Sequence, residues 1–262
     1  MAMPTALVIS GATGRMGRTV AKLAEADPAF RLVGGIDREG AEAPGSLPSL
    51  AAPEGAGALL LGADVLIDFS APVFLRSLLM DRIDILTGTA LVIGTTGLGP
   101  DEERLLDEAA QRSAVLTAAN FSVGVNLLLA LAERAAASLG TEFDIEIVEA
   151  HHRRKEDAPS GTALALGAAV AAGRGVELAG VRRDGRSGRP GPRTEGEVGF
   201  HSLRGGDVVG DHHVHFIGEL EQIELTHRAS DRSLFAAGAL RAARWLHGRA
   251  PGRYTMRDVL GL

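Results

Sequence analysis

Residues 5–26, TALVISGATGRMGRTVAKLAEA, join a short apolar run to a glycine-rich turn and a segment with helical spacing. The run at 5–10 is typical of a buried parallel strand, and residues 16–26 have the periodicity of a helix. Gly11, Gly14 and Gly17 are spaced G-x-x-G-x-x-G between strand and helix. Such a turn lets backbone N–H groups approach a pyrophosphate at the positive end of the helix. The stretch therefore predicts a dinucleotide-binding unit, although a glycine-rich turn that binds no nucleotide is the plainer alternative.

Further apolar runs follow as far as residue 122, and each one breaks into small polar residues. We expect strands within 30–37, 63–70, 90–97 and 113–122. The carboxyl ends of parallel strands meet at one edge of an open sheet, where ligands bind. The pattern predicts a Rossmann-like parallel α/β sheet. Residues 38–58 are rich in Pro, Gly and Ala, and we expect a loop or a short irregular helix there.

Three features at the ends of these strands bear on the cofactor. Asp37 ends the second strand, and a carboxylate there accepts hydrogen bonds from the adenosine ribose, which favours NAD. Arg38 follows directly and can pair with a 2′-phosphate, which favours NADP. The sequences GTTG (94–97) and AANFS (118–122) end the two later strands with small residues, which would leave room for the nicotinamide. Ordinary loop chemistry is the alternative for both.

The pattern of apolar and polar residues changes after Ser122. We expect a smaller α+β domain with a mixed sheet over 123–232, because helical and strand-like segments now alternate without the parallel pattern. Its expected elements are helices at 123–139 and 161–173, a strand at 143–152, a mobile loop at 180–200, and antiparallel strands over 197–229 with turns at Gly205-Gly206 and near Gly218. A closing helix at 231–248 would return to the first domain, which then comprises 1–122 and 233–262.

The stretch EAHHRRKEDAPSGTAL (149–164) collects an unusual set of side chains. His151 and His152 end a strand, so we expect their side chains to point to opposite faces. Lys155 is one of only two lysines among 27 Lys and Arg residues, which favours a role for a compact ammonium. Ser160 or Thr162 can cap the helix that follows, and the N–H groups of Gly161 and Thr162 at its start suit a carboxylate. The set predicts protonation of a small acidic substrate as it receives a hydride.

Composition excludes several classes of function. The formal charge of −6 gives no basic face, so we expect no nucleic-acid or membrane partner. The chain has no cysteine, which excludes thiolate metal sites and cysteine nucleophiles and is compatible with a reducing cytoplasm. The stretch MAMPTALVISGATG lacks the charged and cleavable features of a signal peptide.

Six motifs together resemble the dihydrodipicolinate reductase (4-hydroxy-tetrahydrodipicolinate reductase) family. They are GATGRMG, IGTTG, NFSVGVNLL, E-x-HHRRK-x-DAPSGTAL, SLRGGDVVGDH and THRASDR, in the family's order over nearly the whole chain. The resemblance implies a homotetramer built by the sheet of the second domain. It also implies hydride transfer from NADH or NADPH to a cyclic dicarboxylate with loss of water, in the diaminopimelate route to lysine.

The resemblance also assigns roles to residues of this chain. His151 would donate and accept the proton, and Lys155 would be a second proton donor. The residues that would bind substrate are His152, Ser160, Gly161 and Thr162. The residues that would bind the cofactor are Gly11, Ala12, Thr13, Gly14, Arg15, Met16, Asp37, Arg38, Gly94, Thr95, Thr96, Ala118, Ala119, Asn120, Phe121 and Arg232. An alternative role for Arg232 is to brace the hinge between the two domains.

Two features depart from the family pattern. Ala71 stands where some relatives carry arginine. His213 and His215, next to His212, are extra histidines that share one strand face at i, i+2. No third ligand for a metal is evident from the sequence, so we interpret these side chains as strand-surface histidines and expect no metal site.

Two other functions compete with this hypothesis. A related two-domain oxidoreductase acting on an amino-acid-like imine, such as an aspartate dehydrogenase, would lack the HHRRK…PSGT stretch. A nucleotide sensor or scaffold with a dead site would not need His151, Lys155 and the Gly161-Thr162 turn intact. The sequence therefore favours the reductase.

Overall fold

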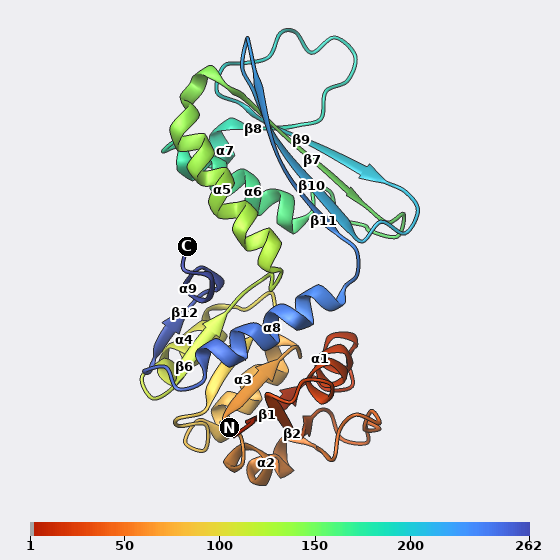
Figure 1. Ribbon diagram of the computed structural model, residues 1–262, viewed down its shortest axis with the longest axis vertical. Helices are drawn as coiled ribbons and strands as arrows, with labels where there is room; N and C mark the ends of the chain where they lie inside the picture. Colours follow the sequence, from red (N-terminus) through yellow and green to blue (C-terminus); the bar gives the residue numbers. More distant parts are fainter. Residues whose placement is uncertain (1–2) are drawn as a thin grey trace. The chain divides into compact units, whose positions relative to one another are not determined.

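The computed structural model describes residues 3–262, so the first two residues of the predicted first domain lie outside it. The chain forms two compact units (Figure 1). One comprises the chain up to Ser122 together with Ser233–Gly261, and the other comprises Val123–Arg232.

The first unit is built on a parallel sheet of seven strands. Their order is β12-β6-β5-β4-β1-β2-β3, and every neighbouring pair is parallel. The strands are β1 (Thr5–Ser10), β2 (Phe30–Ile36), β3 (Leu50–Ala51), β4 (Val65–Asp68), β5 (Ala90–Ile93), β6 (Ala114–Thr117) and β12 (Gly252–Tyr254). β1 and β4 to β6 are almost wholly buried, which explains their continuous apolar runs.

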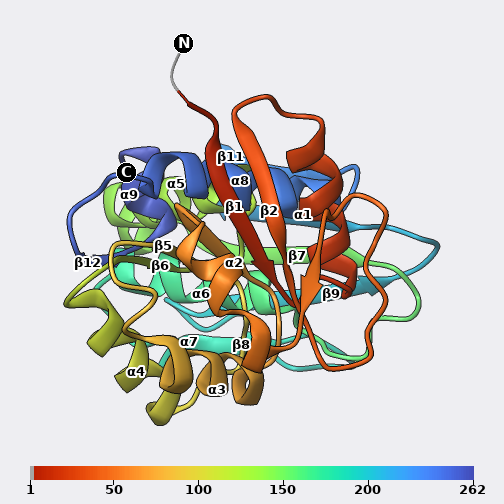
Figure 2. The same ribbon diagram turned by 90° about the horizontal axis from the view of Figure 1, so that it is seen from below.

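Helices cover both faces of this sheet (Figure 2). On one face, α1 (Arg15–Glu25) and α8 (Ser233–Leu246) pack on Leu7, Ile9 and Val92, with α9 (Met256–Leu260) beside them. On the other face, α3 (Pro72–Arg82) and α4 (Pro100–Ala110) pack on Val8 and Leu66, together with α2 (Gly57–Leu61), which follows the short η1 (Pro53–Gly55). Three-layer packing of this kind confirms the predicted Rossmann-like class.

The second unit has a mixed sheet of five strands in the order β11-β10-β7-β9-β8. The strands are β7 (Asp144–His151), β8 (Arg182–Asp184), β9 (Val198–Arg204), β10 (Gly210–Ile217) and β11 (Gln222–Ala229). The helices α5 (Val123–Leu139), α6 (Gly161–Gly173) and the short α7 (Leu178–Val181) lie along one face of it (Figure 1). Alternate strand residues such as Ile147, Phe200 and Val214 form the core beneath α5 and α6.

Helix α5, followed by the turn η2 (Gly140–Glu142), has the length and apolar composition that a membrane-spanning helix needs. In this fold it is a packing helix, because its residues Leu128, Ala132 and Ala136 are buried in the core with α6 and the sheet.

β9 and β10 run antiparallel, as the sequence predicts, but they do not pair with each other: β7 lies between them and pairs parallel with β9 and antiparallel with β10. One sequence expectation is wrong in the second unit. Residues 180–200 are not one loop, because the end of α7, β8 and the start of β9 fall within them. β8 is only three exposed residues long and pairs parallel with β9, so it has no apolar pattern that would reveal it.

Candidate active site

The glycine turn after β1 has the geometry that a close-fitting phosphate loop needs. Gly11 has a φ of +72°, a conformation that L side chains rarely adopt. A Cβ on Gly17 would lie 2.2 Å from the carbonyl oxygen of Gly11, so α1 can approach the turn only because this position is glycine. Gly14 is the N-cap of α1 and offers no side chain to its free N–H groups. The positive end of α1 is therefore open to an anion, and the loop fits a pyrophosphate.

Asp37 follows β2 and is tied to that loop. Its Oδ2 accepts hydrogen bonds from the backbone N–H and the hydroxyl of Thr13, each at 2.8 Å. Its Oδ1 accepts from the N–H of Arg38, whose side chain is exposed. The carboxylate thus holds the glycine loop in place. Of the other loop residues, Ala12 is buried, Met16 packs partly on the core, and Arg15 is exposed.

The carboxyl ends of β5 and β6 enclose a hollow of about 270 Å³, lined by Thr95 to Leu98, Glu103 and Thr117 to Ala119. Gly94 lies behind it, and a Cβ there would lie 2.1 Å from the Phe69 ring. Asn120 accepts a hydrogen bond from the N–H of Ser122, 2.8 Å away. Phe121 is 2 % exposed and packs edge-on against Phe69, so its side chain belongs to the core. Only its backbone is left for a cofactor.

Sequence reasoning missed Asp68, at the carboxyl end of β4. Its Oδ1 accepts from the hydroxyls of Ser10 at 2.5 Å and Ser70 at 2.7 Å, and its Oδ2 accepts from Thr95 at 2.5 Å. Burial raises the pKa of this carboxyl, and the three hydroxyl donors only partly oppose that shift. Asp68 joins the ends of three neighbouring strands and so holds this edge of the sheet together.

In the second unit, Glu149 holds the predicted catalytic residue His151. It is 1 % exposed, and it faces the helices together with His151, two residues on in β7. Nδ1 of His151 lies 2.5 Å from Glu149 Oε2. Arg204, at the end of β9, donates to both carboxylate oxygens at 2.7 and 2.8 Å. Burial alone would raise the pKa of Glu149, but the hydrogen bonds from Arg204 and His151 outweigh it and lower the pKa to about 2.

That ionised carboxylate determines the state of His151. It accepts the Nδ1–H, so Nε2 is the ring position left for proton exchange. Gly210 of β10 lies beside Nε2, and a Cβ there would come within 3.0 Å of it. Sequence reasoning missed both partners. The i, i+2 spacing of Glu149 and His151 was a usable signal, whereas only the pairing of β7 with β9 places Arg204 beside them.

Lys155 lies in the loop after β7, and its backbone N–H donates to the carbonyl of His152 at 3.1 Å. Its ammonium is bound to both oxygens of Asp157, at 2.8 and 2.9 Å. His152 is the first residue beyond β7, and its Nε2 lies 3.0 Å from the guanidinium of Arg232. Burial and then the positive charges of Arg232 and Arg154 lower the pKa of His152. Arg232 is thus placed beside a predicted substrate residue.

Ser160 caps α6, as predicted: its Oγ accepts from the N–H of Ala163 at 3.1 Å. It also lies 3.2 Å from Nε2 of His212, a buried residue of β10. Burial and then the charge of His151 lower the pKa of His212 to about 4, so it is neutral at pH 7. Gly161 is exposed, and a Cβ on it would meet nothing within 4 Å, so the space before the first turn of α6 is open. Thr162, next to it, is partly exposed.

These positions form a site with a definite chemistry. The open N-terminus of α6 and the Lys155 ammonium suit a carboxylate, and His151 can exchange a proton through Nε2. The loop of the first unit suits a dinucleotide.

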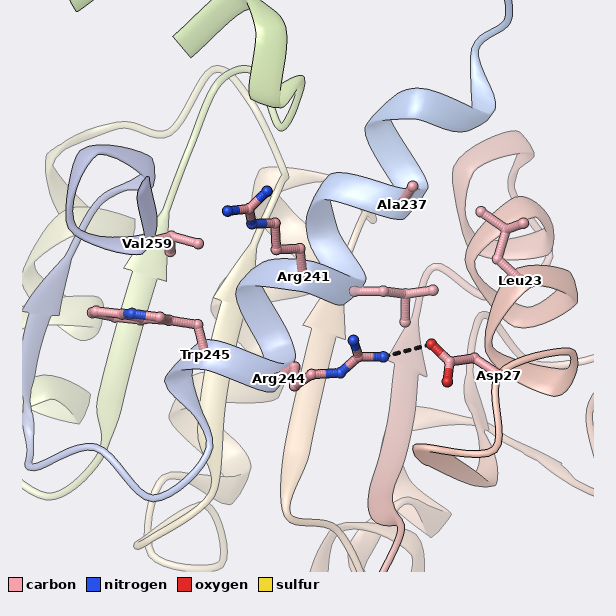
Figure 3. Close-up of a pocket in the computed structure, with 8 residues that line it drawn as sticks. Leu23, Asp27, Ala237, Arg241, Arg244, Trp245 and Val259 are labelled. Atoms are coloured by element: carbon pink, nitrogen blue, oxygen red, sulfur yellow. Dashed lines mark hydrogen bonds and ion pairs between the residues drawn. The ribbon is translucent and has the colours of Figure 1, made fainter. Parts of the chain in front are cut away.

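A hollow of about 670 Å³ also lies between α1 and α8 (Figure 3). Its wall includes Leu23, Leu240 and Trp245, and Arg244 crosses it to bind Asp27 at 2.6 Å. It lies on the helical layer and not at the carboxyl edge of the sheet, so we assign no chemistry to it.

Two protein-family models match the chain, one in its N-terminal part and one in its C-terminal part. Residues 5–121 match the family model described as dihydrodipicolinate reductase, N-terminus. Residues 124–260 match the model described as dihydrodipicolinate reductase, C-terminus.

Relatives of high similarity cover the whole chain. The 4-hydroxy-tetrahydrodipicolinate reductase of Alkalilimnicola ehrlichii is 50% identical over 270 residues, which cover 99% of this chain and 100% of that one. That of Acidiphilium cryptum is 51% identical over 257 residues, covering 97% and 96%. Among solved structures, a dipicolinate-bound dihydrodipicolinate reductase from Paenisporosarcina sp. TG-14 matches in fold with a TM-score of 0.76 at 23% identity, covering 97% and 98%.

Proposed function

The chain belongs to the dihydrodipicolinate reductase family, and we propose that it reduces 4-hydroxy-tetrahydrodipicolinate to tetrahydrodipicolinate. In this reaction the substrate loses one water and gains a hydride and a proton. The reductant is NADH or NADPH, and the product belongs to the diaminopimelate route to lysine. Two relatives near 50% identity over their full lengths carry this name, which supports the same substrate here.

One observation carries the assignment in chemical terms: the Glu149–His151 pair beside the open N-terminus of α6. Glu149 stays ionised and keeps the Nδ1–H of His151 in place. Nε2 of His151 then exchanges the proton that accompanies hydride transfer, and the Lys155 ammonium would be a second proton donor. The tie from Lys155 to Asp157 would be exchanged for a substrate carboxylate on binding.

Substrate would be held by its carboxylates. We assign one of them to the N–H groups of Gly161 and Thr162 and to the hydroxyl of Ser160, because two N–H groups at a helix start favour an anion. His152, supported by Arg232, would contact the substrate from the other end of the loop. Arg204 is not available for this role, because Glu149 and the carbonyl of Asp157 occupy its guanidinium.

The cofactor would bind at residues 11–16 and along the carboxyl edge at 94–96 and 118–121. It supplies the hydride, and the protein positions it: the start of α1 for the pyrophosphate and the hollow beside Thr95 and Ala118 for the nicotinamide. Asp37 would accept from the ribose hydroxyls, and exposed Arg38 would contact the adenine or a 2′-phosphate. Both reduced cofactors are therefore expected to support turnover.

We also propose a homotetramer in the cytoplasm. In the second unit α5 and α6 cover one face of the sheet, while Leu203 and Ile217 point from the other face and are 58% and 39% exposed. Apolar side chains on a sheet face favour packing against another copy. A chain of 262 residues without cysteine is compatible with a reducing compartment.

The test is an assay in which the preceding synthase makes the substrate from pyruvate and aspartate semialdehyde in the cuvette. Purified protein is added with NADH or with NADPH, and the absorbance of the reduced nicotinamide is followed. We expect rapid loss of that absorbance, dependent on the synthase, and the two rates rank the cofactors.

Omitting the synthase, or replacing it with heat-inactivated synthase, is the control for non-specific oxidation. A folded protein that binds NADH but shows no synthase-dependent loss with either cofactor would refute the proposed reaction.

A further inference from the structure

Strand register brings together two histidines and a glutamate on the face of the second sheet that points away from α5 and α6. His213 and His215 alternate along β10 with the buried residues His212, Val214 and Phe216. β10 pairs antiparallel with β11, and Glu224 lies directly opposite His215. The sequence alone showed no third ligand beside the two histidines, because Glu224 is nine residues further on and only this register places it there.

The three side chains converge on one point. Nδ1 of His213 lies 2.7 Å from Oε1 of Glu224, and Nδ1 of His215 lies 4.0 Å from Oε2 of the same carboxylate. One ligand atom from each residue lies within 4.8 Å of the other two. The two rings are stacked, with an angle of 9° between their planes and 6.1 Å between their centroids. In both rings, Nδ1 is thus the nitrogen that faces the carboxylate of Glu224.

Neighbouring side chains orient His213, His215 and Glu224 but do not bury them. The hydroxyl of Thr226 donates to Oε1 of Glu224 at 2.7 Å and lies 3.1 Å from Nδ1 of His213. The amide of Gln222 lies 2.9 Å from Nδ1 of His215. In the single chain the His213 and His215 side chains are 19% and 22% exposed and Glu224 is 44% exposed, so an ion can reach them before copies of the chain pack on this face.

We propose that His213, His215 and Glu224 bind a divalent transition-metal ion, with Zn²⁺ as the preferred occupant. Two imidazole nitrogens and one carboxylate oxygen are a common zinc ligand set, and imidazole favours Zn²⁺, Ni²⁺ or Cu²⁺ over Mg²⁺ and Ca²⁺. Tetrahedral zinc needs ligand atoms roughly 3.3 Å apart, given bonds of about 2.0–2.1 Å. The distances from Nδ1 of His213 and of His215 to the Glu224 oxygens, 2.7 and 4.0 Å, lie on both sides of that value. Small side-chain rotations would therefore bring the three ligand atoms to the spacing that zinc needs. Water would complete the coordination.

The site is separate from the one that performs the proposed reaction. His151, Glu149 and His212 face the helices, whereas His213, His215 and Glu224 point from the opposite face of the same sheet. A bound ion would join β10 to β11, the outermost strand, and so would stabilise that edge of the sheet. The proposal does not rest on the reductase activity.

The experiment measures Zn²⁺ binding to tag-free protein that has been treated with chelator and desalted, in the absence of substrate and cofactor. We expect one Zn²⁺ per chain by competition with a chromophoric chelator and by elemental analysis. Co²⁺ in its place is expected to give the visible absorption of a tetrahedral site. Zn²⁺ is also expected to raise the unfolding temperature.

Three variants locate the ion: His213→Gln, His215→Gln and Glu224→Gln. Each should weaken Zn²⁺ affinity by about 100-fold or more, since even loss of a residue behind a ligand costs 10–100-fold. His247→Gln is the matched control, because His247 is an exposed histidine 3.9 Å from a carboxylate of Asp64 but has no second histidine beside it.

Without metal, Glu224→Gln should melt close to the wild-type temperature, because the side chain is exposed and Gln keeps an oxygen that accepts from Thr226. Absence of stoichiometric Zn²⁺, or Zn²⁺ binding that all three variants retain, would overturn the proposal. Synthase-dependent turnover that fails while Zn²⁺ binding persists would refute only the proposed reaction.

Discussion

A buried carboxylate determines how the proposed proton donor works. Glu149 keeps its charge because Arg204 donates two hydrogen bonds to it, and that charge fixes the orientation and tautomer of His151. The imidazole is therefore prepared before substrate arrives. Lys155 differs, since its ammonium is bound to a largely exposed carboxylate that substrate can replace.

Lys155→Ala tests the proposed role of the ammonium. It should lower kcat by about 10²- to 10⁴-fold, the usual contribution of a positioned acid, and leave NADH affinity unchanged. Lys22→Ala is the matched control, because Lys22 is the chain's other lysine and is exposed on α1. Coupled-assay kinetics and a fluorescence titration of NADH give the two readouts. Wild-type kcat in Lys155→Ala would contradict the assignment.

His212 makes stability depend on pH. Its pKa falls from 6.5 to about 4 on folding, so the unfolded chain binds more protons between these values. The stability is complete above about pH 6.5 and declines as the pH falls toward 4, by on the order of 2 kcal/mol between pH 7 and 5. His152 and His227, whose pKa values are also lowered, act in the same direction.

Urea unfolding at pH 7 and pH 5 measures this dependence. His212→Gln should lose less stability than wild type over that interval, because one titrating group is gone. Glu149 acts only at lower pH, since its folded-state pKa is about 2 and its contribution is lost as the pH falls through and below 4.5. Equal losses in wild type and variant would show that His212 does not carry the effect.

At the residue scale, the local pattern predicts the Ser160 cap, which the structure confirms, while the roles of His151, His152 and Lys155 stay predictions. The local pattern could not identify Arg204 or Asp68. Arg204 reaches Glu149 from another strand 55 positions away, and Asp68 acts through hydroxyls on two other strands. Such pairings are made by tertiary structure, and a single sequence carries no signal for them.

Among the elements, α1 depends on its glycines. Gly17→Ala should be destabilising by about 1–3 kcal/mol, because its Cβ would lie 2.2 Å from the Gly11 carbonyl and must push helix and turn apart. Because the backbone N–H groups at the start of α1 would be displaced, the affinity for NADH should fall at least about tenfold. The control is Gly57→Ala at the start of α2, where a Cβ meets only Ile85 at 3.6 Å. Thermal unfolding and a cofactor titration measure both effects, and wild-type NADH affinity in Gly17→Ala would contradict the role of the loop.

Element types could be predicted wherever burial made the pattern regular. The run at 5–10 and the helices at 123–139 and 161–173 match β1, α5 and α6. Which strands pair with each other could not be predicted: the turn at Gly205-Gly206 indicates that β9 and β10 run antiparallel, but not that β7 lies between them. A turn signal is local, whereas the place of a strand in a sheet is decided by all of its neighbours.

For the whole molecule, the proposed assembly has a direct test. Light scattering should give about four times the 27.2-kDa chain mass. Leu203→Glu should shift the protein toward smaller species, because it puts a charge on the sheet face proposed to pack between copies. Its side chain is 58% exposed, so the single chain should still fold. Leu61→Glu, at a 75% exposed position of α2, is the control. A wild-type mass of one chain would contradict the proposal.

The first unit is discontinuous: the chain leaves it at Ser122 and returns at Ser233. Its core includes Ala236, Ala239, Ala242 and Leu246 of α8, which cover one face of the sheet. On the ribosome, all of Val123–Arg232 is therefore made before this helix exists. The second unit can close while the first still exposes an apolar face, for the roughly one to three seconds that synthesis of residues 233–246 takes. The unit whose synthesis begins first is thus completed last, and the nascent chain exposes this face until α8 has been made.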